Sequence, residues 1–516
     1  MLRFLIFLTF VLSLFPVKGQ EDILSVYQPT LPIVIDRENN MVAELSLLPR
    51  ANAQALESIT LKFTPETPLE YVESVSLYYA GTAKPLNSVK CDNPSYSTFV
   101  VRENKINREI TLKFKQTLFP HSVNYFWISL KLVRNTPLTE KFVMRITAAT
   151  SDAGQVKVND DNQAIHRPAV IVRDAGDDGI RAYRIPGLIT APDGTLVAVY
   201  DIRRNNSADL QEDIQIGVSR SKDGGRTWLP MQVAMDMRGY GGLPDAQNGV
   251  GDPAILSTGK DLWIIALWTH GLGGQRAWTG CRKNAMTPEE QAAQVLVARS
   301  RDNGQTWEKP VNITSQVKDP SWGILLQGPG RGITMRNGTM VFPFQFVDKN
   351  DIPHATIVYS GDQGKTWKIG APARDNTTEA QVVELKNGDL MLNMRDNRGG
   401  MRAVMTTSDM GKTWKDHPSS RKALVEPVCM ASLIAYRNLL LFSNPANSRA
   451  RTDISVKWSG DQGLTWSDGL LLDNGGSWGY SCLTVIDEET VGILYESSQA
   501  HLIFQAIKLE DLLKNK

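Results

Sequence analysis

The sequence predicts an all-β protein in which a β-sandwich domain precedes a six-bladed β-propeller. Three observations lead to this fold class. An eight-residue pattern recurs five times after residue 220, which is typical of repeat architectures. The first third of the chain contains short runs of alternating apolar and polar residues between turn residues. Long stretches with helical periodicity are absent, and the forty glycines and twelve tryptophans agree with a β-rich chain.

The recurring pattern is Ser/Thr-x-Asp-x-Gly-x-Thr-Trp, and it predicts a hairpin turn. The Asp side chain can accept hydrogen bonds from nearby backbone N–H groups, the Gly permits a positive φ, and the Trp anchors the turn. The copies begin 79, 60, 47 and 52 residues apart, which suits a four-stranded unit with loops of variable length. Five copies agree with six blades if one blade lacks the pattern. The copies span residues 221–228, 300–307, 360–367, 407–414 and 459–466.

The chain divides into two expected domains after the amino-terminal segment. Residues 20–160 contain no copy of the pattern and predict an antiparallel β-sandwich. Within them, Thr150 to Asn162 is rich in Asp, Ala, Gly and Asn and predicts a linker. Residues 161–516 are expected to form the propeller. The alternating runs of the first domain are residues 74–79, 109–114, 125–133 and 141–147.

The first nineteen residues predict a cleaved signal peptide. Arg3 supplies positive charge, residues 4–15 form an apolar run, and Pro16 ends it before small residues at 17–19. The run is too short to span a bilayer, and no later stretch is apolar enough, so no membrane span is expected. The protein is therefore expected to be secreted or periplasmic.

Net charge and cysteine usage exclude several classes of function. The formal net charge is +1, so no general attraction to nucleic acid is expected. Cys91, Cys281, Cys429 and Cys482 are too far apart for a metal or redox motif, and both a disulfide and buried free thiols remain open. No cluster of His, Cys and Asp has metal-ligand spacing. We therefore expect no metal and no cofactor, and activity that survives a chelator.

The five repeats resemble the Asp boxes of sialidase-like propellers, and a second motif narrows the resemblance. Residues 183–186 read Tyr-Arg-Ile-Pro, similar to the motif that opens the catalytic domain of bacterial exo-α-sialidases (neuraminidases). Arg184 matches the family's first arginine. Arg203 follows nineteen residues later and matches a second pocket arginine, with Arg204 as the adjacent alternative. Asp209 matches the acid/base aspartate. From here the resemblance covers about two thirds of the chain.

Further matches follow in the family's order. Glu379 matches the catalytic glutamate, Arg395 and Arg451 complete an arginine triad with Arg184, and Tyr480 in Gly-Tyr-Ser matches the nucleophile. Glu496 matches the glutamate that supports the first arginine. In addition, Asp252 resembles a substrate-binding aspartate, although an Asp before Pro253 also suits a turn.

The resemblance implies a retaining exo-α-sialidase that hydrolyses terminal sialic acid from glycoproteins, glycolipids or oligosaccharides. Three guanidiniums would bind the sialic acid carboxylate by charge-assisted hydrogen bonds. A carboxylate nucleophile would be repelled by that group, whereas a neutral phenol would not, and sialidases are the known tyrosine exception among glycosidases. Glu379 would take the proton of Tyr480. Asp209 would protonate the leaving oxygen and then activate water against a sialyl-tyrosine intermediate.

Two other functions remain open at this point. A trans-sialidase would share these residues, and Trp278 and Trp322 are candidates for the rim of its acceptor site. A glycan-binding propeller without catalysis is the third. The insertion from Gly271 to Ala285 is expected at the pocket rim, with a short helix within Thr287 to Gln294. For the amino-terminal domain, a carbohydrate-binding module and a structural spacer are both compatible with the sequence.

Overall fold

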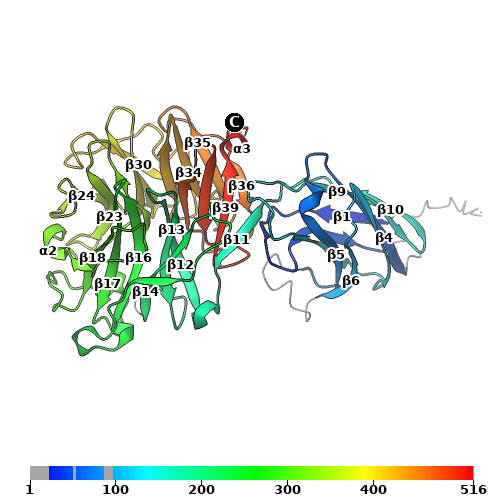
Figure 1. Cartoon of the computed structure of the whole chain (residues 1–516), viewed down its shortest axis with the longest axis horizontal. Helices are drawn as coiled ribbons and strands as arrows, with labels where there is room; N and C mark the ends of the chain where they lie inside the picture. The colour runs from blue at the N-terminus through cyan, green and yellow to red at the C-terminus, as the bar shows by residue number, and fades with distance from the viewer. Residues whose placement is uncertain (1–21, 50–53, 86–96, 211, 515–516) are drawn as a thin grey trace, which may run out of the picture.

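The structure, a computed structural model, describes residues 22–49, 54–85, 97–210 and 212–514, and forms two bodies built almost entirely of β-strands (Figure 1). The predicted signal peptide, residues 1–19, lies outside the described residues, as does Cys91. Within the described ranges no helix is long and apolar enough to cross a membrane. The three described cysteines, Cys281, Cys429 and Cys482, are buried free thiols.

The amino-terminal body is a β-sandwich whose two sheets are joined at one edge by the parallel pair β1 and β10. Side chains from both sheets pack into one core, for example Leu45 and Phe126 from the first and Ile59 from the second. The first sheet has the order β6 (Thr98–Glu103), β5 (Val72–Gly81), β8 (Asn124–Leu132), β3 (Met41–Leu47) and β1 (Ile23–Tyr27). The second has the order β10 (Gly154–Asn159), β9 (Met144–Ser151), β4 (Ala55–Phe63) and β7 (Glu109–Thr117).

The predicted linker from Thr150 to Asn162 is wrong over most of its length. It contains the end of β9 and all of β10, which pair as an antiparallel hairpin around Gly154. Val156 is buried in the core of the sandwich, and its burial favours a strand over an extended connection. The Asp- and Gly-rich composition belongs to the hairpin turn, so the connection between the bodies is only the segment between β10 and β11.

The second body is a propeller of six sheets (Figure 1). Blade 1 contains β12 (Ala182–Thr190), β13 (Leu196–Arg203), β14 (Ile214–Ser221) and β15 (Gln232–Met235). Blade 2 contains β16 (Asn248–Ser257), β17 (Leu262–His270), β18 (Ala293–Ser300) and β19 (Val311–Asn312). Blade 3 contains β20 (Leu325–Gln327), β22 (Ile333–Thr334), β23 (Met340–Val347), β24 (Pro353–Ser360), β25 (Lys368–Ile369) and β26 (Arg374–Asp375). Strand β21 (Gly330–Arg331), which follows β20 in the chain, pairs in parallel with β16 and extends the sheet of blade 2.

Blades 4 to 6 complete the ring. Blade 4 contains β27 (Thr377–Glu384), β28 (Leu390–Asp396), β30 (Ala403–Thr407) and β31 (Lys415–Asp416). Blade 5 contains β33 (Ser432–Tyr436), β34 (Leu439–Pro445), β35 (Ile454–Ser459) and β36 (Leu470–Asp473). Blade 6 contains β37 (Ser481–Val485), β38 (Thr490–Tyr495), β39 (Leu502–Lys508) and β11 (Pro168–Arg173). Short elements outside these sheets are β29 (Gly400–Met401), β32 (Val425–Glu426), α1 (Ala277–Gly280), α2 (Thr314–Val317) and α3 (Leu509–Leu513).

Blade 6 closes the propeller because it combines both ends of the domain. Strand β11, which enters from the sandwich, pairs antiparallel with the carboxyl-terminal strand β39 (Figure 1). On its other side, β11 pairs in parallel with β2 (Ile33–Val34) from the first part of the chain. Main-chain hydrogen bonds thus link the amino-terminal segment to the blade that completes the ring.

The five sequence repeats form one recurring turn, between the third and fourth strands of blades 1 to 5, and blade 6 lacks it. In the first copy, the Asp223 carboxylate accepts from the Ser221 hydroxyl at 2.8 Å and from the Thr227 hydroxyl at 2.6 Å. The backbone N–H of Gly225 donates to Ser221 Oγ at 2.9 Å, and Gly225 has a φ of 93°. The other four copies repeat these contacts.

The predicted helix within Thr287 to Gln294 is absent. Its residues form turns in which the Glu290 carboxylate accepts from the backbone N–H groups of Met286 and Thr287, and Gln294 already belongs to β18. A helical turn, α1, forms instead within the preceding insertion. A side chain that binds the backbone competes with helical hydrogen bonds.

Candidate active site

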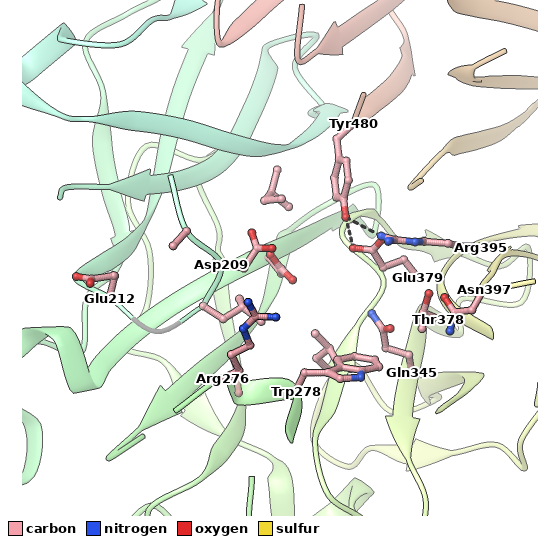
Figure 2. A pocket seen from close by; sticks show the side chains of 16 residues that line it. Asp209, Glu212, Arg276, Trp278, Gln345, Thr378, Glu379, Arg395, Asn397 and Tyr480 are labelled. Atoms are coloured by element: carbon pink, nitrogen blue, oxygen red, sulfur yellow. Dashed lines mark hydrogen bonds and ion pairs between the residues drawn. The ribbon is translucent and has the colours of Figure 1, made fainter. Parts of the chain in front are cut away.

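A cavity of about 700 Å³ lies where the inner strands of the blades begin, and Figure 2 shows the side chains that line it. Tyr480 and Glu379 occupy one side of it with Arg395, Asp209 faces them from the other side, and Trp278 lies on the rim. The complete lining is Ile185, Ala208, Asp209, Leu210, Glu212, Asp252, Arg276, Ala277, Trp278, Leu326, Gln345, Thr378, Glu379, Arg395, Asn397 and Tyr480.

Three inner strands each contain a β-bulge at the level of this cavity. In β12, Arg184 pairs with Asp201 of β13 and Gly187 pairs with Val199, so β12 has one more residue than β13 between these two pairs. The same one-residue excess occurs in β16 between residues 251 and 254, and in β27 between residues 377 and 380. A bulge redirects side chains out of the regular alternation of a strand. The bulges therefore allow inner strands to present polar residues to the cavity.

Two of these bulges place a non-glycine residue in the left-handed region. Ile185 has a φ of 61° and Asp252 has a φ of 57°, and each precedes a proline. For a β-branched residue this conformation is a clear outlier, and such strain persists only where surrounding contacts hold it. Asp252 is therefore more than a turn former, since its bulge lies within β16 and its side chain lines the cavity.

Tyr480, Glu379 and Arg395 form one hydrogen-bonded cluster (Figure 2). The Tyr480 hydroxyl donates to Glu379 Oε1 at 2.5 Å. Arg395 Nη1 donates to Glu379 Oε2 at 2.6 Å and to the Tyr480 hydroxyl oxygen at 3.2 Å. Glu379 is thus both the acceptor of the phenol proton and the ion-pair partner of an arginine that contacts the same phenol oxygen.

Electrostatics keep the phenol protonated in the free protein. Burial and the Glu379 carboxylate raise the pKa of Tyr480 well above its usual value, and Arg395 offsets this only in part. Burial lowers the pKa of Arg395, but the Glu379 carboxylate, with Tyr480 and Cys429, more than compensates, so the net pKa is raised and the guanidinium stays charged. A buried phenol of this kind becomes a nucleophile only if a base takes its proton as it reacts.

Glu496 connects Arg184 to the backbone of the Tyr480 segment. Its Oε1 accepts from Arg184 Nε at 2.7 Å and from the Ile185 N–H at 3.0 Å. Its Oε2 accepts from the Tyr480 N–H at 3.0 Å. Both side chains of the ion pair are buried, with 8% exposure for Arg184 and 1% for Glu496. This pair therefore fixes the first arginine relative to the tyrosine.

The turn before Tyr480 requires glycine. Gly479 has a φ of 88°, and a Cβ atom there would lie 2.8 Å from Pro445 and 3.0 Å from the Cys429 sulfur. Cys429 belongs to the small apolar cluster that also contains Tyr480. Burial raises the pKa of Cys429 to about 12, so it is a packing residue and not a reactive thiol.

Arg203 gathers three carboxylates on the opposite side of the cavity. It donates to Asp201 Oδ2 through Nη2 at 2.8 Å and to Asp209 Oδ1 through Nη1 at 2.7 Å, and its Nη2 lies 4.0 Å from Asp252 Oδ1. Asp201 also accepts from the Asp252 N–H at 2.8 Å. Arg203 and Asp201 are fully buried, whereas the Asp209 side chain is 73% exposed. Asp209 is thus anchored and still accessible.

The three carboxylates differ in proton affinity. Desolvation by the pocket raises the pKa of Asp209, but the guanidiniums of Arg203, Arg184 and Arg395 together outweigh it and leave the pKa below its usual value. Burial raises the pKa of Asp201 to about 6, against the opposing effect of Arg203. Burial, with the Asp201 and Asp209 carboxylates, raises the pKa of Asp252 well above its usual value. In the free protein Asp209 is therefore the carboxylate that stays ionised most readily.

The three arginines of the predicted triad converge on Tyr480. The guanidinium carbons of Arg184 and Arg451 lie 5.7 and 5.9 Å from the centre of its ring, and Arg395 contacts its hydroxyl. The Arg451 guanidinium donates to the backbone oxygens of Trp478 and Val428 and has no ion-pair partner in the described part of the chain. Its charge is therefore uncompensated, as expected of a group that meets an anionic ligand.

The structure separates the competing candidates. Arg204 donates to Gln215, whereas Arg203 donates to Asp209 of the cavity lining, so Arg203 is the arginine of the site. Trp278 of α1 lines the cavity, which confirms the insertion as its rim. Trp322, by contrast, stacks on Phe346 with ring centres 3.7 Å apart and is not part of the lining.

Several residues of the site were missed at the sequence level. Asp201 has a detectable signal, since it lies two positions before Arg203 on one strand and therefore shares its face. Trp478, whose ring lies 4.4 Å from the guanidinium carbon of Arg184, precedes Tyr480 in a segment without regular secondary structure, so no strand periodicity indicates it. For Gln345 and Asn397, which also line the cavity, the local sequence offers no signal.

Both bodies of the chain resemble known proteins. Residues 194–494 match the family model described as a BNR repeat-like domain, and residues 21–155 match the N-terminal domain of BNR-repeat neuraminidase. A sialidase of Bacteroides fragilis is 48% identical, with 97% of each chain covered. A sialidase of Micromonospora viridifaciens is 31% identical over 62% of this chain and 50% of its own length.

Solved structures extend the likeness to three dimensions. The Hadza microbial sialidase Hz136 is 48% identical and superimposes with a TM-score of 0.90, covering 94% of this chain and 99% of that one. Trypanosoma rangeli sialidase, at 24% identity and a TM-score of 0.55, shares the fold over 65% of this chain and 56% of its own. On these matches and the six-bladed architecture, the chain belongs to the family of BNR-repeat sialidases.

Proposed function

We propose that the protein is a retaining exo-α-sialidase that removes terminal sialic acid from glycoconjugates. The observation that carries the proposal is the hydrogen bond of 2.5 Å between the Tyr480 hydroxyl and Glu379, within a ring of three arginines. This arrangement combines a neutral nucleophile, an adjacent base and a binding site for a carboxylate next to the reacting carbon.

In the proposed complex, the sialic acid carboxylate lies among Arg184, Arg395 and Arg451. Charge-assisted hydrogen bonds from guanidiniums fix a carboxylate in position as well as bind it. Because this carboxylate is bonded to the anomeric carbon, binding it places that carbon near the Tyr480 oxygen. Attack by the phenol oxygen forms the bond from tyrosine to the anomeric carbon while the glycosidic bond breaks, and the phenol proton passes to Glu379.

Asp209 supplies the second half of the proposed chemistry. As an acid it protonates the departing glycosidic oxygen, and as a base it then takes a proton from the water that cleaves the sialyl-tyrosine bond. Its low pKa in the free protein suits the second role. For the first, a bound anionic substrate excludes water and offsets the arginine charges, and both effects raise the pKa of a carboxyl group. Two inversions at the anomeric carbon give overall retention.

We further propose that residues 1–19 direct export as a cleaved signal peptide, so that the enzyme meets glycoconjugates outside the cytoplasm. For the amino-terminal sandwich we propose carbohydrate binding. The support for this role is the fold of the sandwich and its position beside a glycosidase propeller. It is tested separately, by comparing the affinity for immobilised glycans of the full chain with that of a variant lacking residues 20–160.

The test of the main proposal is turnover of an aryl α-sialoside by the intact protein, Tyr480→Phe and a matched control, Tyr495→Phe. Tyr495 is a fully buried tyrosine whose hydroxyl donates to Gln505, away from the cavity. We expect near-complete loss in Tyr480→Phe and retained turnover in Tyr495→Phe, with the α-anomer of free sialic acid appearing first by proton NMR. No turnover by the intact protein would favour the glycan-binding propeller. Transfer to added lactose in preference to water would identify a trans-sialidase, for which Trp278 on the rim provides an aromatic surface.

A further inference from the structure

A second cavity, of about 450 Å³, lies at the opposite end of the same inner strands. Three of these strands, β12, β16 and β27, contribute to both cavities. In β12, for example, Arg184 is at the catalytic end and Thr190 lines the second cavity, and in β27 Glu379 and Glu384 are related in the same way. With a rise of about 3.3 Å per strand residue, the two cavities are roughly 15 Å apart. The second is therefore a separate site at the other mouth of the propeller's central channel.

Arg331 of β21 lines this cavity with an uncompensated charge. Its guanidinium donates one hydrogen bond, from Nη1 to the Leu483 backbone oxygen at 3.0 Å. Its Nε is buried without a hydrogen-bond partner, and it forms no ion pair with any residue that the structure describes. Burial lowers the pKa of Arg331, with only the Cys482 thiol acting against this effect. An unpaired guanidinium in such a place costs stability and calls for a binding partner.

The other charged groups of the cavity do not neutralise Arg331. Glu384 is engaged by Arg336, accepting from its backbone N–H at 2.8 Å and from its Nε at 3.0 Å. Two guanidiniums and one carboxylate therefore leave one positive charge without a counter-charge. This balance favours a monoanion over a phosphate dianion.

Apolar side chains surround the guanidinium. The lining contains isoleucine and valine side chains together with serine and threonine residues. The apolar residues are Ile189, Ile333, Val383, Ile434 and Val485, and the hydroxyl residues are Thr190, Ser257, Thr334 and Thr484. A pocket of mixed apolar walls with one charged group is the usual form of a small-molecule site. Its volume of about 450 Å³ lies within the usual range of small-molecule pockets.

We propose that this cavity is a second ligand site, which binds a small organic monocarboxylate through Arg331. The carboxylate accepts from terminal N–H groups of the guanidinium, and its short apolar part contacts the isoleucine and valine side chains. The site is distinct from the catalytic cavity and does not depend on the activity proposed for it.

Calorimetric titration of the full chain with 2-methylpropanoate, alongside Arg331→Met and Arg331→Lys, tests the proposal. The catalytic cavity is common to all three proteins, so differences between them report the second site. We expect Arg331→Met to lose affinity by about ten- to a hundredfold, the effect of one or two charge-assisted hydrogen bonds, and Arg331→Lys to lose less. Turnover of an aryl α-sialoside should be equal in all three, which separates this proposal from the catalytic one.

Three outcomes would overturn the proposal. Identical titrations of wild type and Arg331→Met would show that the guanidinium binds no carboxylate. Failure of Arg331→Met to fold would show that Arg331 is a structural link to blade 6, because a residue held open for a ligand should be dispensable for folding. Equal affinity for sulfate in a parallel titration would contradict the role of the apolar walls.

Discussion

Replacing Glu496 with glutamine should reduce both stability and catalysis, because this carboxylate receives three donors at once. Its Oε1 accepts hydrogen bonds from Arg184 Nε and the Ile185 N–H, and its Oε2 accepts one from the Tyr480 N–H. A glutamine of the same shape has one acceptor oxygen, so in its best orientation the Tyr480 N–H faces an amide N–H. The buried Arg184 also loses its counter-charge. Breaking a buried ion pair from one side costs about 3–5 kcal/mol, and a displaced reacting group can cost about a hundredfold in rate.

The matched control is Glu426→Gln. Glu426 is another fully buried carboxylate, which pairs with Arg402 at 2.8 Å and accepts from the Asp396 N–H at 2.7 Å, but none of its hydrogen bonds involves Arg184, Ile185 or Tyr480. Urea unfolding should show a loss of about 3–5 kcal/mol for both variants. Only Glu496→Gln should lower kcat/KM for an aryl α-sialoside, by about a hundredfold, under conditions where both are folded. Equal kcat/KM for the two variants would refute the positioning role of Glu496, and unchanged stability would refute the stated cost of its burial.

Three further outcomes are expected. Asp209→Asn should lower kcat/KM, which reports the step up to formation of the sialyl-tyrosine, by about 10²–10⁴-fold on a sialylated sugar and by much less on an aryl sialoside, whose leaving group needs no proton; equal losses of kcat/KM on both would contradict its role as the acid. His166 is fully buried, and burial lowers its pKa to about 4 in the folded protein, compared with about 6.5 in the unfolded chain. The free energy of unfolding is therefore unaffected by this group above pH ~6.5 and decreases as the pH falls from about 6.5 towards 4. Wild type should therefore lose about 2 kcal/mol more than His166→Phe between pH 7 and pH 5 in urea unfolding, and equal losses would rule out this linkage. Incubation with EDTA should leave turnover unchanged, and a loss restored by a divalent metal would contradict the metal-free mechanism.

Features that depend on a few consecutive residues were predictable. The repeat encodes its turn within eight residues, since the Asp, Ser, Gly and Thr that bind one another in the first copy all lie between Ser221 and Thr227. The alternating runs of the first domain likewise predicted strands, as residues 74–79 of β5 and 109–114 of β7 show. The same local logic failed for residues 150–162, because a hairpin turn and a linker share a composition and only packing of Val156 against the sandwich core distinguishes them.

The geometry of the active site could not be predicted from the sequence. The types and order of the nine predicted residues led to the family, and through it to a hypothesis for each role. Their geometry depends on contacts between distant segments: Arg184 meets Glu496 across 312 positions, and Tyr480 meets Glu379 across 101. The bulges in β12, β16 and β27 likewise form only when each inner strand pairs with its neighbour.

The sequence by itself thus determined the repeated turns, the all-β class and the chemical groups available for catalysis, because each is written in short segments whose hydrogen bonds close locally. Only the tertiary structure decided which groups share a cavity, which carboxylates compete for Arg203, and that Arg331 is left without a counter-charge. These are properties of the closed ring, in which burial and charge depend on side chains brought together from different blades.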